Sequence, residues 1–320
     1  MNFIRRPAAA ALVAALVTLA VSAQADEPAA PPGPILGKSV VTRVKIGVVI
    51  TADTGPCKGI VASAPVPTNW PEQQVKVEKE ETSPNVQKIQ YHTLGGTVRQ
   101  MIVTVPKLKM GEVATASVIF EVTRRTLLPP LDKAAYKLLA HPEKKPELLP
   151  YLNPSPFIES RNDKVVKLAK EVTAGKEDWA KVEAIYDAGQ ARLTYREGGP
   201  IKGALEALEE GTGHCEEFSS LFIAMCRAVG IPARTVWVPS HCYSEFYMVD
   251  ADAKGFWFPC QSAGDRSFGG IPETRYILQK GDNFRDSARP GGEPIRYVDG
   301  FMKGVGGNQP KCEFLREDLK

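Results

Sequence analysis

The sequence lacks the features that define several common functional classes. After its first 25 residues it has no hydrophobic run long enough to span a membrane. It contains no Cys-x-x-Cys pair of the zinc-ribbon or zinc-finger kind and no acidic calcium-binding loop. The glycine-rich segment 291–307 has no phosphate-binding turn between a strand and a helix, so a loop is expected there. With a formal net charge of only +3 in 320 residues, the chain gives no indication of a nucleic-acid partner, and no cofactor or metal is expected.

The N-terminus has the pattern of a secretory signal peptide over residues 1–25. Arg5 and Arg6 precede an apolar run over residues 8–21, and small residues ending at Ala25 then provide a cleavage site. The run is short for a membrane span and ends in a cleavable motif, which favours a signal peptide over an anchor. We expect cleavage near Ala25, export to the periplasm or out of the cell, and a mature chain without a membrane span.

The first part of the mature chain predicts an all-β domain. Residues 40–50 alternate between apolar and polar side chains, which is typical of a strand with one buried face. Four later segments alternate in the same way and are separated by turn-rich sequence; they are 74–77, 86–91, 99–105 and 115–123. We therefore expect a small sandwich-like β domain over residues 38–128, after a Pro-rich leader over residues 26–37.

Prolines separate this β domain from a second, mixed domain. Residues 129–158 are Pro-rich and are expected to form a linker with one short helix. Residues 159–290 combine helical periodicity with alternating segments, which predicts an α+β domain, and residues 291–320 are expected to be a C-terminal tail. The expected helices are 132–140, 165–172, 177–189, 202–210 and 215–229, and the expected strands are 241–249, 255–261 and 275–284.

The most informative stretch is residues 211–221, GTGHCEEFSSL, which sets Cys215 between a glycine turn and a helix. Gly211 and Gly213 allow a tight turn and leave space for a substrate to approach the sulfur. Apolar residues then recur at three- and four-residue intervals up to a Gly-Ile-Pro stop at 230–232. In the first helical turn, unpaired N–H groups and the positive end of the helix dipole favour a thiolate and can hold an oxyanion. Cys215 is therefore a candidate nucleophile.

One of the four histidines is suited to be the base that serves this cysteine. A thiolate nucleophile needs a partner that accepts and returns protons, and an imidazole does this best near neutral pH. His92 and His141 lie in segments with no other reactive residue. His214 lies at the expected cleft, but it directly precedes Cys215, so its side chain is expected to point elsewhere. His241 remains as the candidate base.

His241 begins the first of two strands that are expected to form a hairpin. The turn-like segment 250–255 separates them, and a hairpin centred early in this turn places His241 opposite Gln261 and Cys242 opposite Cys260. The Gln261 amide is then beside the imidazole and able to orient it. In an exported chain with six cysteines, Cys242 and Cys260 are the best candidates for a disulfide.

The cysteine turn, the helix and the histidine strand together resemble the transglutaminase-like superfamily, whose members are relatives of papain-type thiol enzymes. The resemblance covers residues 179–261 and rests on three segments in the family's order: GHCEEFSSLFIAMCRAVGIPARTV, HCYSEFY and FWFP. It implies a helix bearing the nucleophile Cys215, packed on an antiparallel sheet that carries the base His241, with an accessory β domain in front. The family usually has an aspartate on the strand after the histidine, where this chain has Gln261. An amide can orient the imidazole, but it cannot stabilise an imidazolium as an anion does.

Other residues near the expected cleft have both functional and structural interpretations. Tyr195 lies where the family often has an aromatic residue leading to the cleft, and it is expected either to contact an oxyanion or substrate or to pack in a strand. Trp237 is expected either to shape an acyl-binding channel or to be buried in the core. Arg234 is expected to form an ion pair with Glu216 or Glu217.

These expectations converge on acyl transfer through a cysteine thioester, with a peptide or protein as substrate and no cofactor. Water as the second nucleophile gives a protease or amidase, and an amine gives a transglutaminase; the resemblance to exported bacterial members favours hydrolysis. The alternative is a catalytically silent relative that binds peptide or cell-wall material through the same cleft, which the atypical Gln261 keeps open. A zinc site made of the His-Cys pairs at 214–215 and 241–242 is disfavoured, because two of the four side chains would point away from the other two.

Overall fold

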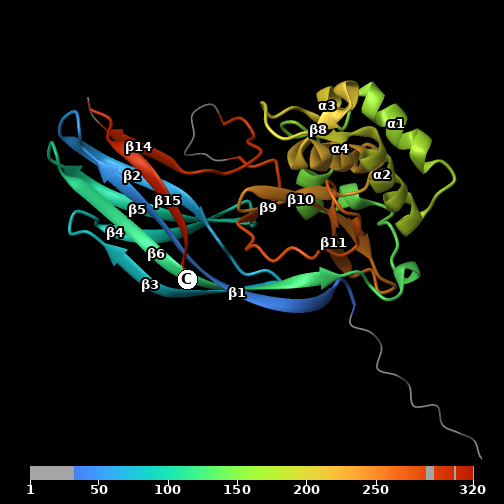
Figure 1. The fold of residues 1–320 in the computed structure, drawn as a ribbon, viewed down its shortest axis with the longest axis horizontal. Coiled ribbons are helices and arrows are strands. Elements are labelled where there is room, and N and C mark those ends of the chain that lie inside the picture. The colour runs from blue at the N-terminus through green and yellow to red at the C-terminus, as the bar shows by residue number, and fades with distance from the viewer. Residues whose placement is uncertain (1–31, 286–291, 306–307, 320) are drawn as a thin grey trace, which may run out of the picture. The chain divides into compact units, whose positions relative to one another are not determined.

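The computed structural model describes residues 32–285, 292–305 and 308–319. The expected signal peptide, 1–25, and residues 26–31 of the expected leader lie outside the described residues. The described chain is α+β with mostly antiparallel sheets, as the sequence predicted (Figure 1). No helix among the described residues is long and apolar enough to cross a membrane.

Two sheets make up the β-rich half of the chain. The smaller sheet has the strand order β15-β1-β6-β3, and facing it lie β2, β4, β5 and β14, which belong to a larger nine-stranded sheet. The apolar faces of the two sheets meet in one buried cluster, which receives Val48, Ile60, Val103 and Phe120 from four different strands. These strands are β1 Ile35–Thr51, β2 Cys57–Val66, β3 Gln73–Thr82, β4 Lys88–Leu94, β5 Val98–Leu108, β6 Val113–Leu128, β14 Phe301–Val305 and β15 Lys311–Leu319.

The other half packs helices on the remaining strands of the larger sheet. Helix α4 lies directly on β9 and β10, and α1, α2 and α3 all contact α4 (Figure 1). The helices are α1 Asp163–Thr173, α2 Asp178–Arg192, α3 Ala204–Glu210 and α4 Cys215–Ala228. The strands are β7 Thr194–Tyr195, β8 Thr212–Gly213, β9 Ala233–Val238, β10 His241–Val249, β11 Gly255–Gln261, β12 Ser267–Phe268 and β13 Gln279–Lys280. Three short 3-10 helices precede them, η1 Lys133–Ala135, η2 Pro142–Lys144 and η3 Pro146–Tyr151.

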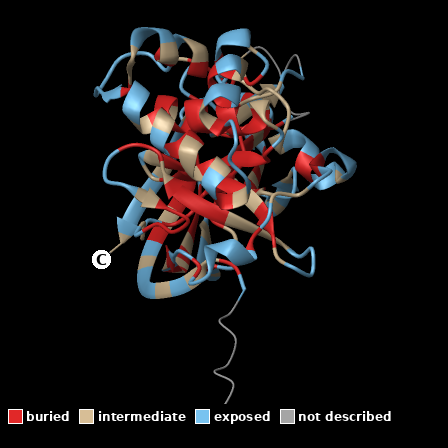
Figure 2. Cartoon of the chain, turned by 90° about the vertical axis from the view of Figure 1, so that its right-hand side faces the viewer, coloured by how far each residue is buried: buried red, intermediate tan, exposed pale blue. Residues whose placement is uncertain are grey.

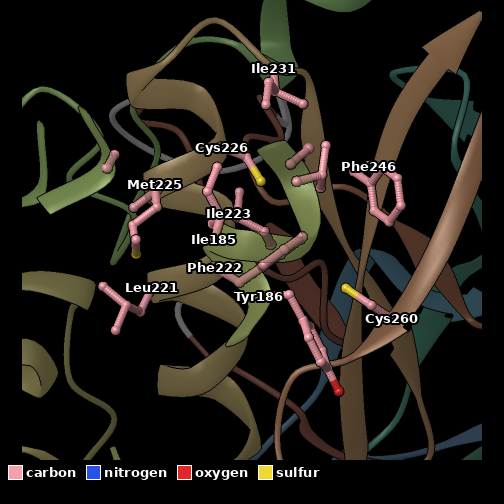
Figure 3. Packing of buried hydrophobic residues seen from close by; sticks show 14 of the residues in the cluster. Ile185, Tyr186, Leu221, Phe222, Ile223, Met225, Cys226, Ile231, Phe246 and Cys260 are labelled. Carbon is pink, nitrogen blue, oxygen red and sulfur yellow. The ribbon is translucent and has the colours of Figure 1, made fainter. Parts of the chain in front are cut away.

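Helix α4 is buried along almost its whole length between the other helices and the sheet. Its apolar residues pack with Tyr186 of α2 and Phe246 of β10 (Figure 3). Cys226 of α4 and Cys260 of β11 project into the same cluster as buried apolar groups. In Figure 2 buried residues occupy the interior between helices and sheet, and exposed residues the outer helix faces. Each fully buried Leu or Phe side chain contributes about 2 kcal/mol, so this packing holds α4 firmly in place.

One short strand joins the two halves into a single sheet. Strand β13 pairs with β9 on one side and with β5 on the other, so the nine-stranded sheet continues from the helix-covered strands into the β-rich half. Beside this junction, the buried Lys280 ammonium lies 2.7 Å from the Glu72 carboxylate and 2.5 Å from that of Glu245. The burial of these three charges is tolerated because each has a partner of opposite sign. Backbone pairing and this buried ion cluster together fix how the halves meet.

Several strands differ from what the sequence predicted. The loop expected over 291–307 is wrong for Phe301–Val305, which forms β14 against β2. Strand β2 itself was not predicted, and the strand expected over 275–284 is confined to Gln279–Lys280. Residues 311–319 form β15 and pair with β1. The partners lie far away in the sequence, so these strands depend on long-range hydrogen bonding and burial more than on local alternation.

The β10–β11 hairpin has a longer turn than expected. Val249 pairs with Gly255, so five residues, 250–254, form the connection. The Asp250 carboxylate stabilises this turn by accepting a hydrogen bond from the Lys254 N–H at 2.9 Å. The register therefore shifts by two residues from the expected one. Because strand side chains repeat every two residues, each side chain stays on its expected face.

This register separates the two cysteines that were expected to form a disulfide. Cys260 lies opposite Ser244 rather than Cys242. Both cysteines are free thiols, and each packs into a different part of the interior. The expected pairing of Cys242 with Cys260 was therefore wrong, because the longer turn displaces one strand along the other.

Replacing Lys280 leaves the Glu72 and Glu245 carboxylates buried without their shared cation. We expect Lys280→Met to lower the free energy of unfolding by about 3 kcal/mol or more, as measured by urea denaturation. The control Arg266→Met removes an exposed ion pair with Glu183 and is expected to change the same quantity by less than about 1 kcal/mol. A Lys280→Met protein as stable as the wild type would show that the ion cluster is not what secures the junction.

Candidate active site

Cys215 occupies the first position of α4, as predicted. His214 is the N-cap: its Nδ1 accepts a hydrogen bond from the Glu216 N–H at 3.2 Å, and the Glu217 carboxylate accepts one from the His214 N–H at 2.9 Å. This is a capping box in which an imidazole takes the place of the usual hydroxyl. A Cβ on Gly213 would approach the Glu217 Cβ to 2.5 Å, so the turn needs glycine there. His214 thus caps the start of the helix, a role that the sequence analysis did not predict.

Cys215, His241 and Gln261 come together where α4 meets the β10–β11 hairpin. The His241 imidazole is close enough to the Cys215 sulfur for each group to shift the pKa of the other. Its Nε2 lies 3.3 Å from Oε1 and 3.0 Å from Nε2 of the Gln261 amide. With Nε2 facing this amide, Nδ1 is the nitrogen left for the sulfur. The main-chain carbonyl of Gln261 accepts a hydrogen bond from the Tyr186 hydroxyl at 2.7 Å. This bond anchors the end of β11 to α2.

The surroundings stabilise the charged forms of Cys215 and His241. A hydrogen bond from the Cys242 thiol, together with the contact to His241, outweighs burial and lowers the pKa of the Cys215 thiol far below its ordinary value. Burial disfavours the imidazolium, but the hydrogen bonds to Cys215 and Gln261 and the charge of the thiolate raise the pKa of His241. A thiolate–imidazolium pair is therefore the favoured resting state of the site.

Cys242 is a site residue that the sequence analysis assigned to a disulfide. Its buried thiol donates to Ser219 Oγ, one helical turn beyond Cys215, at 3.7 Å, and its interaction with the Cys215 sulfur is the largest influence on the pKa of Cys215. The hydrogen bond to Cys215, aided by burial, raises the pKa of the Cys242 thiol, which therefore stays protonated and able to donate. The backbone N–H of Cys242 also lowers the pKa of the Cys215 thiol. The only indication in the sequence was that Cys242 directly follows His241. Its position beside Cys215 depends on how α4 packs against β10.

A cleft of about 440 Å³ opens beside the Cys215 sulfur and the His241 imidazole. Trp237 forms part of its wall, but the indole N–H donates to the Gly281 carbonyl at 2.8 Å and is not available to an oxyanion. The apolar wall consists of Phe157, Ile201, Trp237 and Val238, and the polar wall of Glu216, Ser240, Arg296, Tyr297 and Arg316. Among the described residues, no three His, Cys, Asp or Glu side chains are placed to bind one metal ion.

Tyr195 lies beside the cysteine turn. Strand β7 pairs in parallel with β8, which places Tyr195 opposite Gly213. Its ring is half exposed, and desolvation together with the nearby Cys215 raises the pKa of its hydroxyl. A second cleft of about 270 Å³ opens beside this turn, and its walls include Lys202 and His214. Two clefts therefore border the cysteine turn, one lined by Gly213 and His214 and the other by Cys215.

The ion pair expected for Arg234 was wrong. Its guanidinium pairs with the Glu245 carboxylate at 2.7 Å, because the two residues are cross-strand neighbours on β9 and β10. Glu216 lies 3.3 Å from the Arg296 guanidinium instead, a partner that is 80 residues away in sequence. Glu217 is occupied by the helix cap. No local pattern points to Arg296, which reaches α4 from the segment between β13 and β14.

Residues 166–262 match the family model of the transglutaminase-like superfamily. This segment contains Cys215, His241 and Gln261, and the match confirms the resemblance to this superfamily that the sequence analysis described. The structure is similar, with a TM-score of 0.57, to that of a putative cysteine protease from Cytophaga hutchinsonii; the two are 19% identical, and the match covers 90% of this chain and 93% of the other. A putative protease from Parabacteroides distasonis matches with a TM-score of 0.28 and 16% identity over 69% of this chain and 43% of that one, too weakly to support any conclusion. No curated protein sequence matches the chain.

The role of Cys242 can be separated from that of His241 by titrating the Cys215 thiolate. We expect Cys242→Ala to raise the pKa of Cys215 by about one to two units, because a hydrogen bond to a charged group contributes about 1.5–3 kcal/mol. The pH dependence of iodoacetamide alkylation measures this pKa. Cys260→Ala is the matched control, since it removes a buried thiol from the same sheet without touching Cys215, and its titration should follow the wild type. Identical curves for all three proteins would rule out thiol donation from Cys242.

Proposed function

We propose that this chain is an exported thiol hydrolase that cleaves peptide or amide bonds through a thioester on Cys215. The contact between Cys215, His241 and Gln261 beside a cleft carries the proposal. A stabilised thiolate, a protonated imidazole and a group that orients the imidazole are what cysteine-dependent amide hydrolysis requires. The fold shared with a putative cysteine protease supports the same class of reaction. The pattern of residues 1–25 supports export.

Acylation begins with the thiolate. The Cys215 sulfur attacks the carbonyl carbon of the scissile amide, and the carbonyl oxygen becomes an oxyanion. We assign the Cys215 N–H, one of the free donors of the first helical turn, as a stabiliser of this oxyanion. The His241 imidazolium then gives its proton to the amide nitrogen, the C–N bond breaks, the amine leaves, and a thioester remains.

Deacylation returns the site to its starting state. Neutral His241 takes a proton from water as the water oxygen attacks the thioester carbonyl, the C–S bond breaks, and a carboxylic acid and the Cys215 thiolate are released. Gln261 accepts the Nε2–H bond in both halves of the reaction and keeps the ring in place. An amine in place of water completes a transamidation by the same steps; the resemblance to exported bacterial members favours water.

Peptide acyl transfer to Cys215 is tested directly by intact-mass spectrometry. After incubation with a peptide mixture and acid quenching, the wild-type protein should carry an acyl adduct on Cys215. His241→Ala should form it about a hundredfold more slowly or not at all, because the proton donor is lost. Cys312→Ala, which removes a cysteine outside the site, should form it normally. Absence of any adduct, together with iodoacetamide labelling at the rate of an ordinary thiol, would leave a catalytically silent peptide- or cell-wall-binding module.

Gln261 variants test how the amide acts on the imidazole. The ion pair exists above the lowered pKa of Cys215 and below the raised pKa of His241, so kcat/KM for a peptide substrate should rise, level off and then fall as pH increases. Gln261→Glu supplies an anion of equal reach and should move the alkaline limb up by about one unit. Gln261→Met lacks the acceptor, so its alkaline limb should move down and its kcat/KM should fall by about tenfold or more. Three coinciding alkaline limbs would contradict this role.

A further inference from the structure

The polar wall of the cleft contains one positive charge that the site does not neutralise. Cys215 and His241 form one pair of opposite charges. Glu216 and Arg296 form a second pair, at 3.3 Å. Arg316 is the remaining charged group of the lining, and it has no counterpart of opposite sign there.

The Arg296 guanidinium interacts with groups of the protein itself. Its guanidinium donates to Ser220 Oγ at 2.6 Å and to the Glu216 carbonyl at 3.2 Å, and it lies 5.2 Å from the centre of the Trp237 ring. Only 6% of its side chain is exposed. Arg296 therefore forms part of the fixed wall, with its charge balanced by Glu216 and its donors directed at α4.

Arg316 reaches the same cleft from strand β15 and remains exposed. Its register partner is Ile46 of β1, so it is held by the β-rich half of the chain. Its guanidinium lies 3.5 Å from the Tyr297 hydroxyl, and among the described residues no carboxylate forms an ion pair with it. Tyr297 packs edge-on against Trp237, with ring centroids 5.1 Å apart. A guanidinium and a hydroxyl thus lie side by side on the rim of the cleft.

We infer that Arg316 and Tyr297 form a subsite for a carboxylate, and that the enzyme selects substrates with a carboxylate near the scissile amide. A guanidinium presents parallel N–H donors that match the two oxygens of a carboxylate, and the hydroxyl adds another donor. The anion would restore the charge balance of the cleft. The identity of the bond that is broken rests on the proposed function, whereas the charge preference rests on the geometry of the rim.

Two alkylating reagents of nearly equal size test the charge preference without any peptide. Iodoacetate is an anion and iodoacetamide is neutral, and both react with the Cys215 sulfur. In the full chain, we expect Arg316→Gln to lower the ratio of the iodoacetate rate to the iodoacetamide rate by about two- to fivefold, the range for an exposed ion pair. In the wild type the ratio should also fall as salt is raised, because salt screens an exposed charge.

Lys311→Gln is the matched control, since it removes the same charge from β15 at a residue outside the cleft lining. Its rate ratio should equal that of the wild type. A ratio that is unaffected by both Arg316→Gln and salt, with iodoacetamide labelling still fast, would overturn the carboxylate subsite and leave the proposed function standing. Slow labelling of Cys215 by both reagents would instead overturn the proposed function.

The source of the carboxylate is resolved with matched peptide pairs. One pair differs only in a C-terminal acid or amide, and the other only in a Glu or Gln next to the scissile bond. A higher kcat/KM for the acid member of one pair, lost in Arg316→Gln, supports the subsite and assigns it to a chain end or to a side chain. Equal kcat/KM values within both pairs would overturn the inference.

Discussion

The packing of α4 against β10 is the contact on which the site depends. It brings the N-terminal turn of the helix, with Cys215, against the strand that carries His241 and Cys242. The buried, mainly apolar surface of α4 supplies the stabilisation, and the capping box at His214 sets where the helix begins. A shift of one residue in either element would move the sulfur away from the imidazole. The contact between these two groups therefore requires this one alignment of α4 with β10.

The electrostatics of the site follow from this packing. The sulfur is surrounded by donors from β10, namely the imidazole, a thiol and a backbone N–H, and each favours the thiolate. The amide of Gln261 provides orientation where related enzymes use a carboxylate, so the negative charge that stabilises the imidazolium comes mainly from the sulfur itself. Cys215 and His241 therefore depend on each other for their charged states.

The sequence was informative wherever a role follows from a local pattern. Cys215 at a helix start and His241 at a strand start are both local features, and Gln261 was placed correctly despite a register error because a shift of two residues preserves the face. The function of Cys242 and the partner of Arg234 were missed, since both are set by contacts between elements. Strands β2, β14 and β15 were not predicted for a related reason. Their hydrogen-bond partners lie far away in the sequence, and alternation of apolar and polar residues alone does not identify them.

The pairing of β1 with β15 has a consequence for how the chain folds. The helix and hairpin that bring Cys215 and His241 together lie within residues 215–261, whereas Arg316 is placed by pairing with Ile46, at the opposite end of the described chain. Closing such a long loop costs more conformational entropy, and pairings of this range form slowly in folding. In the proposed site, the reactive pair depends on contacts within residues 215–261, whereas the proposed charge preference depends on the β1–β15 pairing. Loss of the β15 pairing would therefore leave a sulfur that still reacts but no longer favours a charged substrate.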